Sequence, residues 1–291
     1  KLEKIKHDQN DETMIRGSHQ EDMLALKSLI GKVFKDDDQF IDLFFKYQYQ
    51  DNALVYEMEG KIVSMAFLLP ATIFSTGKYH PVTYVYACAT DEKYRGLGLM
   101  REIIRKAYRD ACAKGEAGLF LLPASEELYT YYGKIGFRTF FYKQQSFAVA
   151  GVASSISYSL AELTAFEYTW LRPQFLKTSN SIHWPLNHFQ LLENDNKTRC
   201  PQFFSLTFQD DKKAIGFYYK ENDEIRVLEL LGSDKAEEAL LSFFNDRYFL
   251  EELNSIIINK PRGDIPYGMI WLNQNISLSD TEKGYFAFAL D

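Results

Sequence analysis

Cysteine is scarce in the 291-residue sequence: Cys88, Cys112 and Cys200 are the only three, and they form no CxxC pair. A sparse, odd count of this kind excludes a disulfide framework and a cysteine-based zinc site. The five histidines are scattered, with no HxxxH or HExxH pair, so the sequence predicts no metal centre. No apolar run approaches the roughly 18 residues of a membrane-spanning helix, and the polar start lacks a signal peptide's apolar core. We therefore expect a cytoplasmic protein without a membrane partner.

Positive charge is also in short supply, with 33 Lys and Arg against 40 Asp and Glu and a net charge of -7. A nucleic-acid-binding protein usually shows a basic stripe, and none stands out, so we predict no nucleic-acid partner. The acidic balance favours a cationic substrate such as an amine, and it equally favours solubility alone. Hydrophobic residues make up 46% and aromatic residues 15% of the chain. This composition is sufficient for a sizeable core and argues against disorder.

Two domains are expected from the length, at roughly 100–200 residues per domain. The small, Ser-rich stretch 151–159 is the best linker candidate, which divides the chain into residues 1–150 and 151–291. In the first domain, Ser18-His19-Gln20-Glu21 forms a capping box before a helix. The remaining elements expected there are a helix over 38–47, strands over 53–58, 61–74 and 79–89, a helix after Gly98, a buried strand over 119–122, a helix over 126–134 and a strand ending near 149.

The second domain is also predicted to contain both helices and strands. Ser159-Leu160-Ala161-Glu162 predicts a second capping box, opening a helix that ends near Arg172 before Pro173. A short helix over 183–192, strands over 203–208, 214–220 and 225–231, a helix over 236–249, and strands over 256–258, 269–272 and 285–289 complete the prediction. The fold class is therefore α/β (α+β), a mixed and mostly antiparallel sheet with helices on both faces.

A glycine-rich turn joins the third predicted strand to the next helix, with the sequence Arg95-Gly96-Leu97-Gly98-Leu99-Met100. The first amides of a helix have no intrahelical partners and lie at the positive end of the helix dipole. Glycine allows a bulky anion to approach the backbone. The pattern suits a pyrophosphate, although an ordinary strand-to-helix turn has the same composition.

This turn resembles the Arg/Gln-x-x-Gly-x-Gly/Ala signature of the GCN5-related N-acetyltransferase (GNAT) superfamily, with Met100 where Gly or Ala is usual. Residues 125–137, Ser-Glu-Glu-Leu-Tyr-Thr-Tyr-Tyr-Gly-Lys-Ile-Gly-Phe, resemble its second motif. The two motifs have the family's order and separation, and the likeness covers about residues 12–147. Within the superfamily, the run 123–126 followed by 132–137, together with the large C-terminal portion, is most similar to the Eis-type (enhanced intracellular survival) acetyltransferases.

The resemblance implies an N-acetyltransferase that binds acetyl-CoA and transfers its acetyl group directly to a primary amine. It implies Tyr132 as the general acid that protonates the leaving thiolate, with Tyr129 and Tyr131 as local competitors. It implies a backbone amide near the end of the third strand that stabilises the oxyanion. The coenzyme-binding residues it implies are Cys88, Ala89, Thr90, Arg95, Gly96, Leu97, Gly98, Leu99, Met100 and Ser125.

Several of these residues have alternative interpretations. Ser125 also suits a plain helix cap, and Cys88 is interpreted as a packing cysteine because no histidine stands in a matched position to activate it. Arg101 and Arg105 could meet phosphates, but we expect both on a solvated helix face. No general base is identified, since neither Glu57 nor Glu59 stands in a motif. In some relatives the terminal carboxylate reaches the active site, and the corresponding residue here is Asp291. The apolar run 285–290 that precedes it also fits a closing strand.

The second domain lacks any Arg-x-x-Gly-x-Gly run. We therefore expect a degenerate GNAT-like domain that shapes the acceptor pocket or an oligomer interface. Two other functions remain open at this point. One is a non-catalytic acyl-CoA-binding sensor, which needs the phosphate site and no acid. The other is a paired-domain aminoacyl or peptidyl transferase. The missing basic patch argues against such a transferase with an RNA-linked donor.

Overall fold

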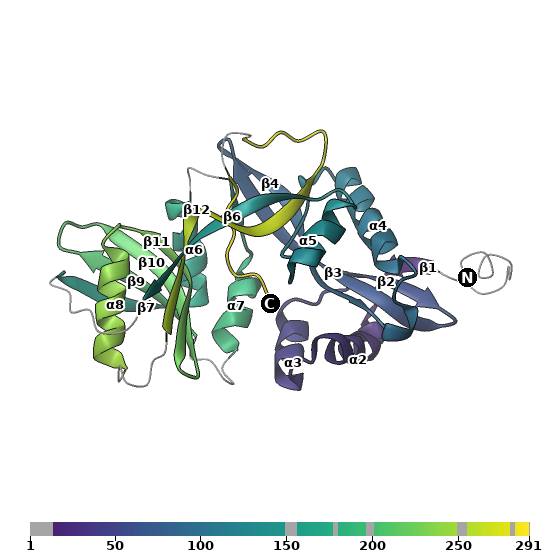
Figure 1. Cartoon of the computed structure of the whole chain (residues 1–291), viewed down its shortest axis with the longest axis horizontal. Coiled ribbons are helices and arrows are strands. Elements are labelled where there is room, and N and C mark those ends of the chain that lie inside the picture. The colour runs from purple at the N-terminus through teal and green to yellow at the C-terminus, as the bar shows by residue number, and fades with distance from the viewer. Residues whose placement is uncertain are drawn as a thin grey trace. The chain divides into compact units, whose positions relative to one another are not determined.

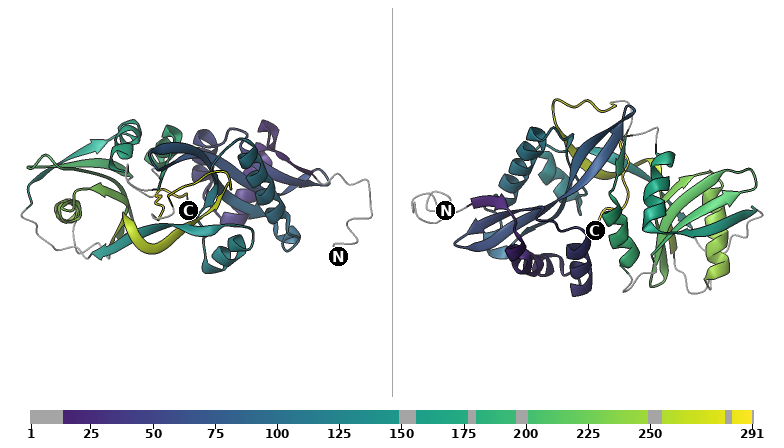
Figure 2. Two further views of the ribbon diagram at one scale, coloured as in Figure 1. Left: turned by 90° about the horizontal axis from the view of Figure 1, so that it is seen from above. Right: turned by 180° about the vertical axis from the view of Figure 1, so that it is seen from behind.

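A computed structural model describes residues 14–148, 156–176, 180–195, 201–248, 255–279 and 283–290 (Figures 1 and 2). The chain forms two compact units. Unit 1 comprises residues 1–72, 80–138 and 269–277, and unit 2 comprises residues 73–79, 139–268 and 278–291. The units therefore differ from two continuous domains divided at residue 150, because residues 269–277 close the sheet of unit 1.

Unit 1 contains most of the elements that the sequence predicts for the first domain. Its sheet has the order β1-β2-β3-β4-β5-β12. The elements are β1 (Met14–Gly17), η1 (Gln20–Asp22), α2 (Met23–Phe34), α3 (Asp38–Tyr47), β2 (Ala53–Met58), β3 (Lys61–Ser75), β4 (Lys78–Thr90), η2 (Glu92–Tyr94), α4 (Leu99–Ala113), β5 (Gly118–Leu121), α5 (Glu126–Gly133) and the end of β12 (Ser255–Leu272).

Helices cover both faces of the sheet of unit 1, with α4 and α5 on one face and α2 and α3 on the other (Figure 1). The alternation of a strand explains this arrangement, because successive side chains point to opposite faces. Ala66 packs in the cluster formed with α4, whereas its neighbour Phe67 meets Phe44 of α3 with ring centroids 4.9 Å apart. Most strand pairs are antiparallel, but β4 and β5 run parallel and are connected by α4.

Unit 2 is built from later residues in the order β12-β11-β10-β9-β7, with β6 beside β12. Helix α8 packs on one face of its sheet, and aromatic residues of α6 and α7 pack on the other. The elements are β6 (Arg138–Ala148), β7 (Tyr158–Leu163), α6 (Ala165–Phe175), β8 (Ser181–His183), α7 (Leu186–Asn194), β9 (Gln202–Phe208), β10 (Lys213–Glu221), β11 (Glu224–Gly232), α8 (Ala236–Arg247) and most of β12.

The two units share one order of elements. Apart from the short strand β8 between α6 and α7 and the 3-10 helices η1 and η2, the series β7, α6, α7, β9, β10, β11, α8, β12 repeats the series β1, α2, α3, β2, β3, β4, α4, β5. In both units one helix connects a pair of parallel neighbouring strands: α4 connects β4 with β5, and α8 connects β11 with β12. The predicted mixed sheet with helices on both faces is confirmed, and the second unit is a related fold.

The predicted capping box at Ser159–Glu162 is wrong, because these residues lie in β7. Tyr158 and Leu160 alternate onto the core, and β7 pairs with β9 through contacts such as Leu160 with Leu206. The capping box lies slightly later, where the Thr164 amide donates to Glu167 Oε2 at 2.8 Å and the Glu167 amide donates to Thr164 Oγ1 at 3.2 Å. The helix then continues through Pro173 to Phe175.

The end of the chain also differs from the prediction. The strands expected over 256–258 and 269–272 are the two ends of the single strand β12. Residues 285–289 form no strand, since Tyr285 makes an isolated bridge with Ser181 and residues 286–290 are irregular yet buried. Most of the linker candidate, residues 151–155, and the predicted lead-in 1–11 lie outside the described residues. No helix in the described ranges is long and apolar enough to span a membrane.

Candidate active site

The turn between β4 and α4 places two glycines in the left-handed region. Gly96 has φ 78° and Gly98 has φ 82°, and a Cβ atom on either would meet nothing within 4 Å. Side chains are strained at these angles, so the backbone requires glycine here. The Asp91 carboxylate holds the start of the turn by accepting from the Lys93 amide at 3.1 Å. The turn therefore presents backbone to open space.

A cavity of about 210 Å³ lies against this turn. Gly98 caps the 15-residue helix α4, so the unpaired amides and the positive dipole end of a long helix face this region. Arg95 is fixed partly by donating from Nε to the Thr90 carbonyl at 3.2 Å. An anion that reaches the cavity meets helix amides and two guanidinium groups. The lining residues are Thr90, Tyr94, Arg95, Gly96, Gly98, Leu99, Met100, Arg101 and Tyr131.

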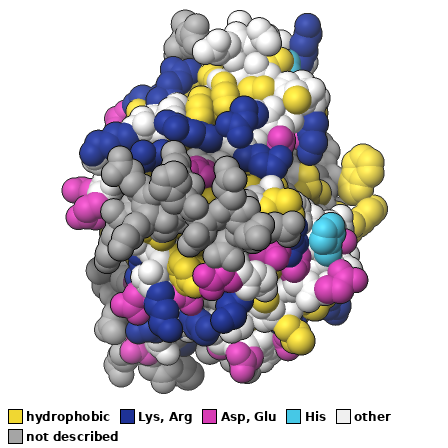
Figure 3. Space-filling model, turned by 90° about the vertical axis from the view of Figure 1, so that its right-hand side faces the viewer, with side chains coloured by type: hydrophobic (Ala, Val, Ile, Leu, Met, Phe, Trp, Pro, Cys, Tyr) yellow, Lys and Arg dark blue, Asp and Glu magenta, His cyan; other side chains and the backbone are white. Residues whose placement is uncertain are grey.

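Basic side chains extend along the outer face of α4. Arg101, Arg105 and Arg109 recur every four residues and are all exposed, which places them on one face of the helix. Lys and Arg side chains form a band across the upper part of the face seen in Figure 3, the side of unit 1 on which α4 lies. Arg105 is exposed, as expected, whereas Arg101 is exposed and also lines the cavity. We expected no basic stripe, but the three arginines of α4 form one.

Strand β4 extends past its parallel partner. The register of β4 with β5 consists of Thr83 with Leu119 and Tyr84 with Phe120, whereas β4 continues to Thr90. Ala87 has φ 48°, which marks an irregularity just before Cys88. On the side of β3, the Ser64 hydroxyl donates to the Ala89 carbonyl at 3.0 Å and lies 2.8 Å from Thr90 Oγ1. The segment 88–90 is therefore held from one side at the exit of the sheet.

Tyr132 lies in the last turn of α5 and is 7% exposed. It packs edge-on against Phe137, with ring centroids 5.7 Å apart, and Cys88 packs against the same core cluster. Burial, together with the neighbouring Cys88, raises the pKa of Tyr132 well above its usual value of 10.0. Tyr132 therefore stays protonated, as a general acid must, and it lies beside the β4 exit.

Cys88 is unsuited to act as a nucleophile. Burial raises the pKa of its thiol to about 11, and only the thiolate is nucleophilic. This agrees with the prediction of a packing cysteine. The sequence reasoning treated Tyr131 as a competitor of Tyr132, and the structure gives Tyr131 a place of its own in the cavity wall. Burial raises the pKa of Tyr131 as well.

The remaining predicted residues lie in different settings. The Met100 side chain packs against the core cluster beneath α4 while also lining the cavity, so this departure from the Gly or Ala pattern leaves the turn open. Ser125 is the N-cap residue of α5, is exposed, and does not line the cavity. The Ser125 hydroxyl lowers the pKa of the Glu127 carboxyl group. Its role towards the coenzyme stays a prediction.

No general base emerges from the residues considered in the sequence. The Glu57 carboxylate accepts from Arg16 Nε at 2.8 Å, and Glu59 occupies the β2–β3 turn with φ 51°. Asp291 lies outside the described residues, so its predicted role is not tested. The residues from 285 to 290 that precede it are buried in unit 2.

Trp271 is a site-supporting residue that sequence reasoning missed. Its strand segment pairs with β5, and a Cβ atom on Gly136 would lie 2.6 Å from the Trp271 ring. The same ring stacks on Tyr108 of α4 with centroids 3.8 Å apart. Gly136 of the second motif is therefore required by the close approach of an indole that is 135 residues away in the chain. No local pattern signals such a contact.

The part of the chain that contains this site matches a known protein family. Residues 14–140 match the family model of the acetyltransferase (GNAT) domain, which includes the β4–α4 turn and α5. No curated protein sequence matches the chain.

Solved structures are similar over most of the chain. A GCN5-related N-acetyltransferase from Anabaena variabilis has a TM-score of 0.75 at 14% identity, covering 89% of this chain and 72% of that one. Eis1 from Mycobacterium abscessus has a TM-score of 0.65 at 13% identity, covering 90% and 73%. A tandem GNAT protein from the clavulanic acid biosynthesis pathway has a TM-score of 0.54 at 10% identity, covering 90% and 97%. At these identities the likeness shows the fold: a GNAT fold with a second GNAT-like domain.

Proposed function

We propose that this chain, whose residues 14–140 match the family model of the acetyltransferase (GNAT) domain, transfers an acetyl group from acetyl-CoA to a primary amine. The observation that carries the proposal is the β4–α4 turn, where Gly96 and Gly98 face open space at the start of a long helix. Arg95 and Arg101 flank the same cavity. A pyrophosphate needs such a combination of free amides, helix dipole and cations.

Each part of the site has a role in direct transfer. The amides of the first turn of α4 hold the pyrophosphate, and the β4 segment 88–90 supplies a backbone amide to the oxyanion that forms when a neutral amine attacks the thioester carbonyl. The Tyr132 hydroxyl then donates its proton to the departing thiolate. The attacking nitrogen releases one proton to solvent water, and this balances the proton that Tyr132 takes back from solvent before the next turnover. The high pKa of the Cys88 thiol supports transfer without an acyl-enzyme.

The proposal extends to an Eis-type enzyme with a small-molecule or peptide amine as acceptor. The similarity in fold to Eis1 over 90% of this chain supports this choice. The rival function is a non-catalytic acyl-CoA sensor. A sensor would need the same phosphate site but would not require a buried, protonated Tyr132.

Replacing Gly98 with glutamate is the direct test of the coenzyme site. The variant puts a side chain and a negative charge into the turn, and we expect acetyl-CoA affinity to fall by about 10- to 100-fold, the worth of one or two charge-assisted hydrogen bonds. Calorimetric titration with acetyl-CoA measures the change. Transfer of acetyl groups to amines should fall with it.

Gly115→Glu is the matched control. Gly115 lies just beyond the other end of α4, has φ 75°, and also faces open space. The substitution therefore introduces the same charge and similar backbone strain about 25 Å away along the helix. Equal loss of affinity in both variants, or unchanged affinity in folded Gly98→Glu, rules out the proposed coenzyme site.

Unit 2 is expected to bind no second coenzyme. At the equivalent β11–α8 turn, a Cβ atom on Gly232 would lie 2.4 Å from the Lys213 carbonyl, so that glycine faces a neighbouring strand. Glu237 and Glu238 occupy the first turn of α8 and repel a phosphate. Calorimetry should therefore give one acetyl-CoA per intact chain, and a stoichiometry of two would contradict the degenerate character of this unit.

A further inference from the structure

Residues 284–290, the closing segment of unit 2, are buried without forming a strand. Two isolated bridges join the start of this segment to β6 and β8. The Ile182 amide donates to the Tyr285 carbonyl at 2.9 Å, and Trp184 Nε1 donates to the Ala287 carbonyl at 2.8 Å. The closing segment is therefore held by a few specific contacts and not by a continuous sheet ladder.

Phe288 anchors the closing segment in the aromatic core of unit 2. Its side chain is 1% exposed, and its carbonyl lies 2.8 Å from His188 Nε2. Its φ of 63° is a left-handed conformation, which a bulky residue keeps only where its surroundings impose it. The rings that surround it are Tyr168, Phe189, Phe203 and Phe217.

Two buried histidines support this region, and both carry their proton on Nε2. A carbonyl oxygen can only accept, so His188 Nε2 donates to Phe288. The Ser181 hydroxyl donates to the Leu176 carbonyl at 3.2 Å, which leaves its oxygen to accept from His183 Nε2 at 3.1 Å. Each Nδ1 atom is buried and has no hydrogen-bond partner among the described residues. A proton added at Nδ1 would therefore be a buried donor without an acceptor there, which is costly.

The charges around the two rings also oppose protonation. Burial and the Arg172 cation lower the pKa of His183 to about 3. Burial is also the main cause that lowers the pKa of His188 to about 4, with Arg172 adding to it and the bond to the Phe288 carbonyl opposing it. Glu229 offers no relief, because Arg172 and Tyr168 already donate to its two oxygens.

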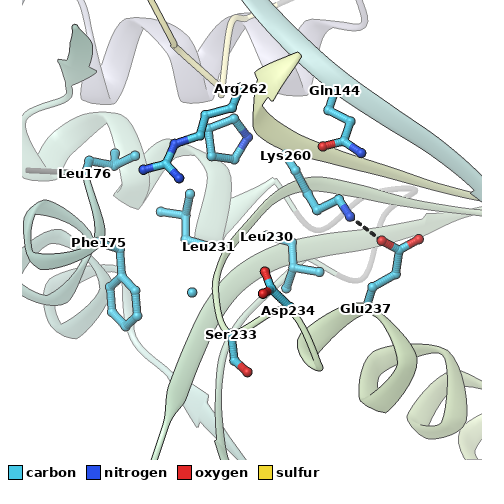
Figure 4. Close-up of a pocket in the computed structure, with 12 residues that line it drawn as sticks. Gln144, Phe175, Leu176, Leu230, Leu231, Ser233, Asp234, Glu237, Lys260 and Arg262 are labelled. Atoms are coloured by element: carbon cyan, nitrogen blue, oxygen red, sulfur yellow. Dashed lines mark hydrogen bonds and ion pairs between the residues drawn. The ribbon is translucent and has the colours of Figure 1, made fainter. Parts of the chain in front are cut away.

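One edge of this cluster lies next to solvent. A cavity of about 440 Å³ opens beside the end of α6, and Leu176 is part of its wall (Figure 4). The Leu176 carbonyl is joined to His183 through the Ser181 hydroxyl. The other titratable side chains of the cluster are tyrosines. Tyr79 meets the His183 ring edge-on, and burial raises the pKa of Tyr168 and Tyr285 well above 10.0, so these two stay neutral.

We propose that His183 and His188 form an acid-sensitive clasp that holds the closing segment in unit 2 and releases it when the rings are protonated. Release lets an imidazolium reach water, where the pKa of histidine is about 6.5. The clasp is therefore complete above about pH 6.5 and weakens as the pH falls towards the pKa of about 4 of docked His188. The clasp lies wholly in unit 2, so the proposal does not depend on the proposed coenzyme site.

Hydrogen–deuterium exchange of the full chain tests the proposal at about pH 7.5 and about pH 5, with rates corrected for intrinsic exchange at each pH. We expect the protection of residues 284–290 to fall by about 10- to 100-fold at the lower pH for each histidine that must ionise. The central strand β10 of the same unit should keep its protection. Equal protection of the closing segment at both pH values, or an equal loss in β10, overturns the proposal.

Glutamine variants assign the effect, because the glutamine amide can donate as Nε2 does and does not titrate. His183→Gln and His188→Gln should each reduce the pH dependence of protection, and the double variant should remove it. His19→Gln, at an exposed histidine of unit 1, is the matched control and should leave the pH dependence unchanged. A pH dependence that persists at full size in both single variants, or in the double variant, overturns the assignment.

Discussion

Tyr132→Phe is expected to lower kcat about 100- to 10,000-fold, the usual contribution of a positioned general acid. The substitution retains the ring that packs on Phe137 and removes only the hydroxyl that lies beside Cys88. Acetyl-CoA affinity should remain within a few-fold, because the phosphates are held at the β4–α4 turn. Steady-state kinetics under conditions where chemistry limits turnover, together with calorimetry, measure the two quantities.

The pH dependence gives an independent check on the same residue. Since burial raises the pKa of Tyr132 well above 10.0, the acid remains protonated and usable through the alkaline range. Ionisation of Tyr132 should therefore cause no loss of kcat up to about pH 10, the usual value for tyrosine. A decline near pH 8 that disappears in Tyr132→Phe would contradict the buried, protonated state.

Tyr131→Phe is the matched control, because Tyr131 is the adjacent tyrosine and lines the coenzyme cavity. Its loss should affect acetyl-CoA affinity more than kcat. If Tyr131→Phe shows the large loss of kcat and Tyr132→Phe runs at the parent rate, the general acid is Tyr131 and the match to the second motif is displaced by one residue.

Arg172→Leu is expected to destabilise unit 2 by about 3–5 kcal/mol, the usual cost of leaving a buried charge without its partner. Arg172 and Glu229 are 1% and 0% exposed. They are joined by Nε to Oε2 at 2.7 Å and Nη2 to Oε1 at 2.9 Å. Tyr168 also donates to Glu229 at 2.7 Å, and Arg172 Nη1 donates to the Ile182 carbonyl at 2.7 Å. Urea unfolding followed by circular dichroism measures the loss.

The double variant Arg172→Leu with Glu229→Leu should be more stable than the single variant, because it removes both charges from the core. Lys27→Met is the surface control. It breaks an ion pair to Asp42 whose side chains are 28% and 70% exposed, and it should change the free energy of unfolding by less than about 1 kcal/mol. A double variant that is less stable than Arg172→Leu would show that the cost arises from packing and not from an unmatched charge.

Local patterns were sufficient to predict the elements around the site. The prediction for 38–47 agrees with α3 because Asp37 caps it, accepting from the amides of Gln39 and Phe40 at 2.9 Å. The strand 53–58 agrees with β2, and Glu59 and Gly60 form the tight turn that follows, both with positive φ. The glycine-rich turn was also predicted, since left-handed glycines before an amphipathic helix are a local signal.

Long-range pairing was not predictable from such patterns. The segment 269–272 shows only a short apolar run, yet it completes the sheet of unit 1 beside β5. At 159–162 a pattern of Ser and Glu three residues apart resembles a capping box. The segment is nevertheless a strand, because it pairs with β9. Arg172 was predicted near the end of a helix, and nothing local indicated that Glu229, 57 residues later, would neutralise it in the core.

The central claim is most directly tested by mass spectrometry after the full chain is incubated with acetyl-CoA and a pool of primary amines. We expect at least one amine to gain a single acetyl group, with one CoA thiol released for each, and Gly98→Glu to form much less product than Gly115→Glu. Stoichiometric binding of acetyl-CoA without acetylation of any amine across a broad pool would contradict the claim and favour a non-catalytic acyl-CoA sensor.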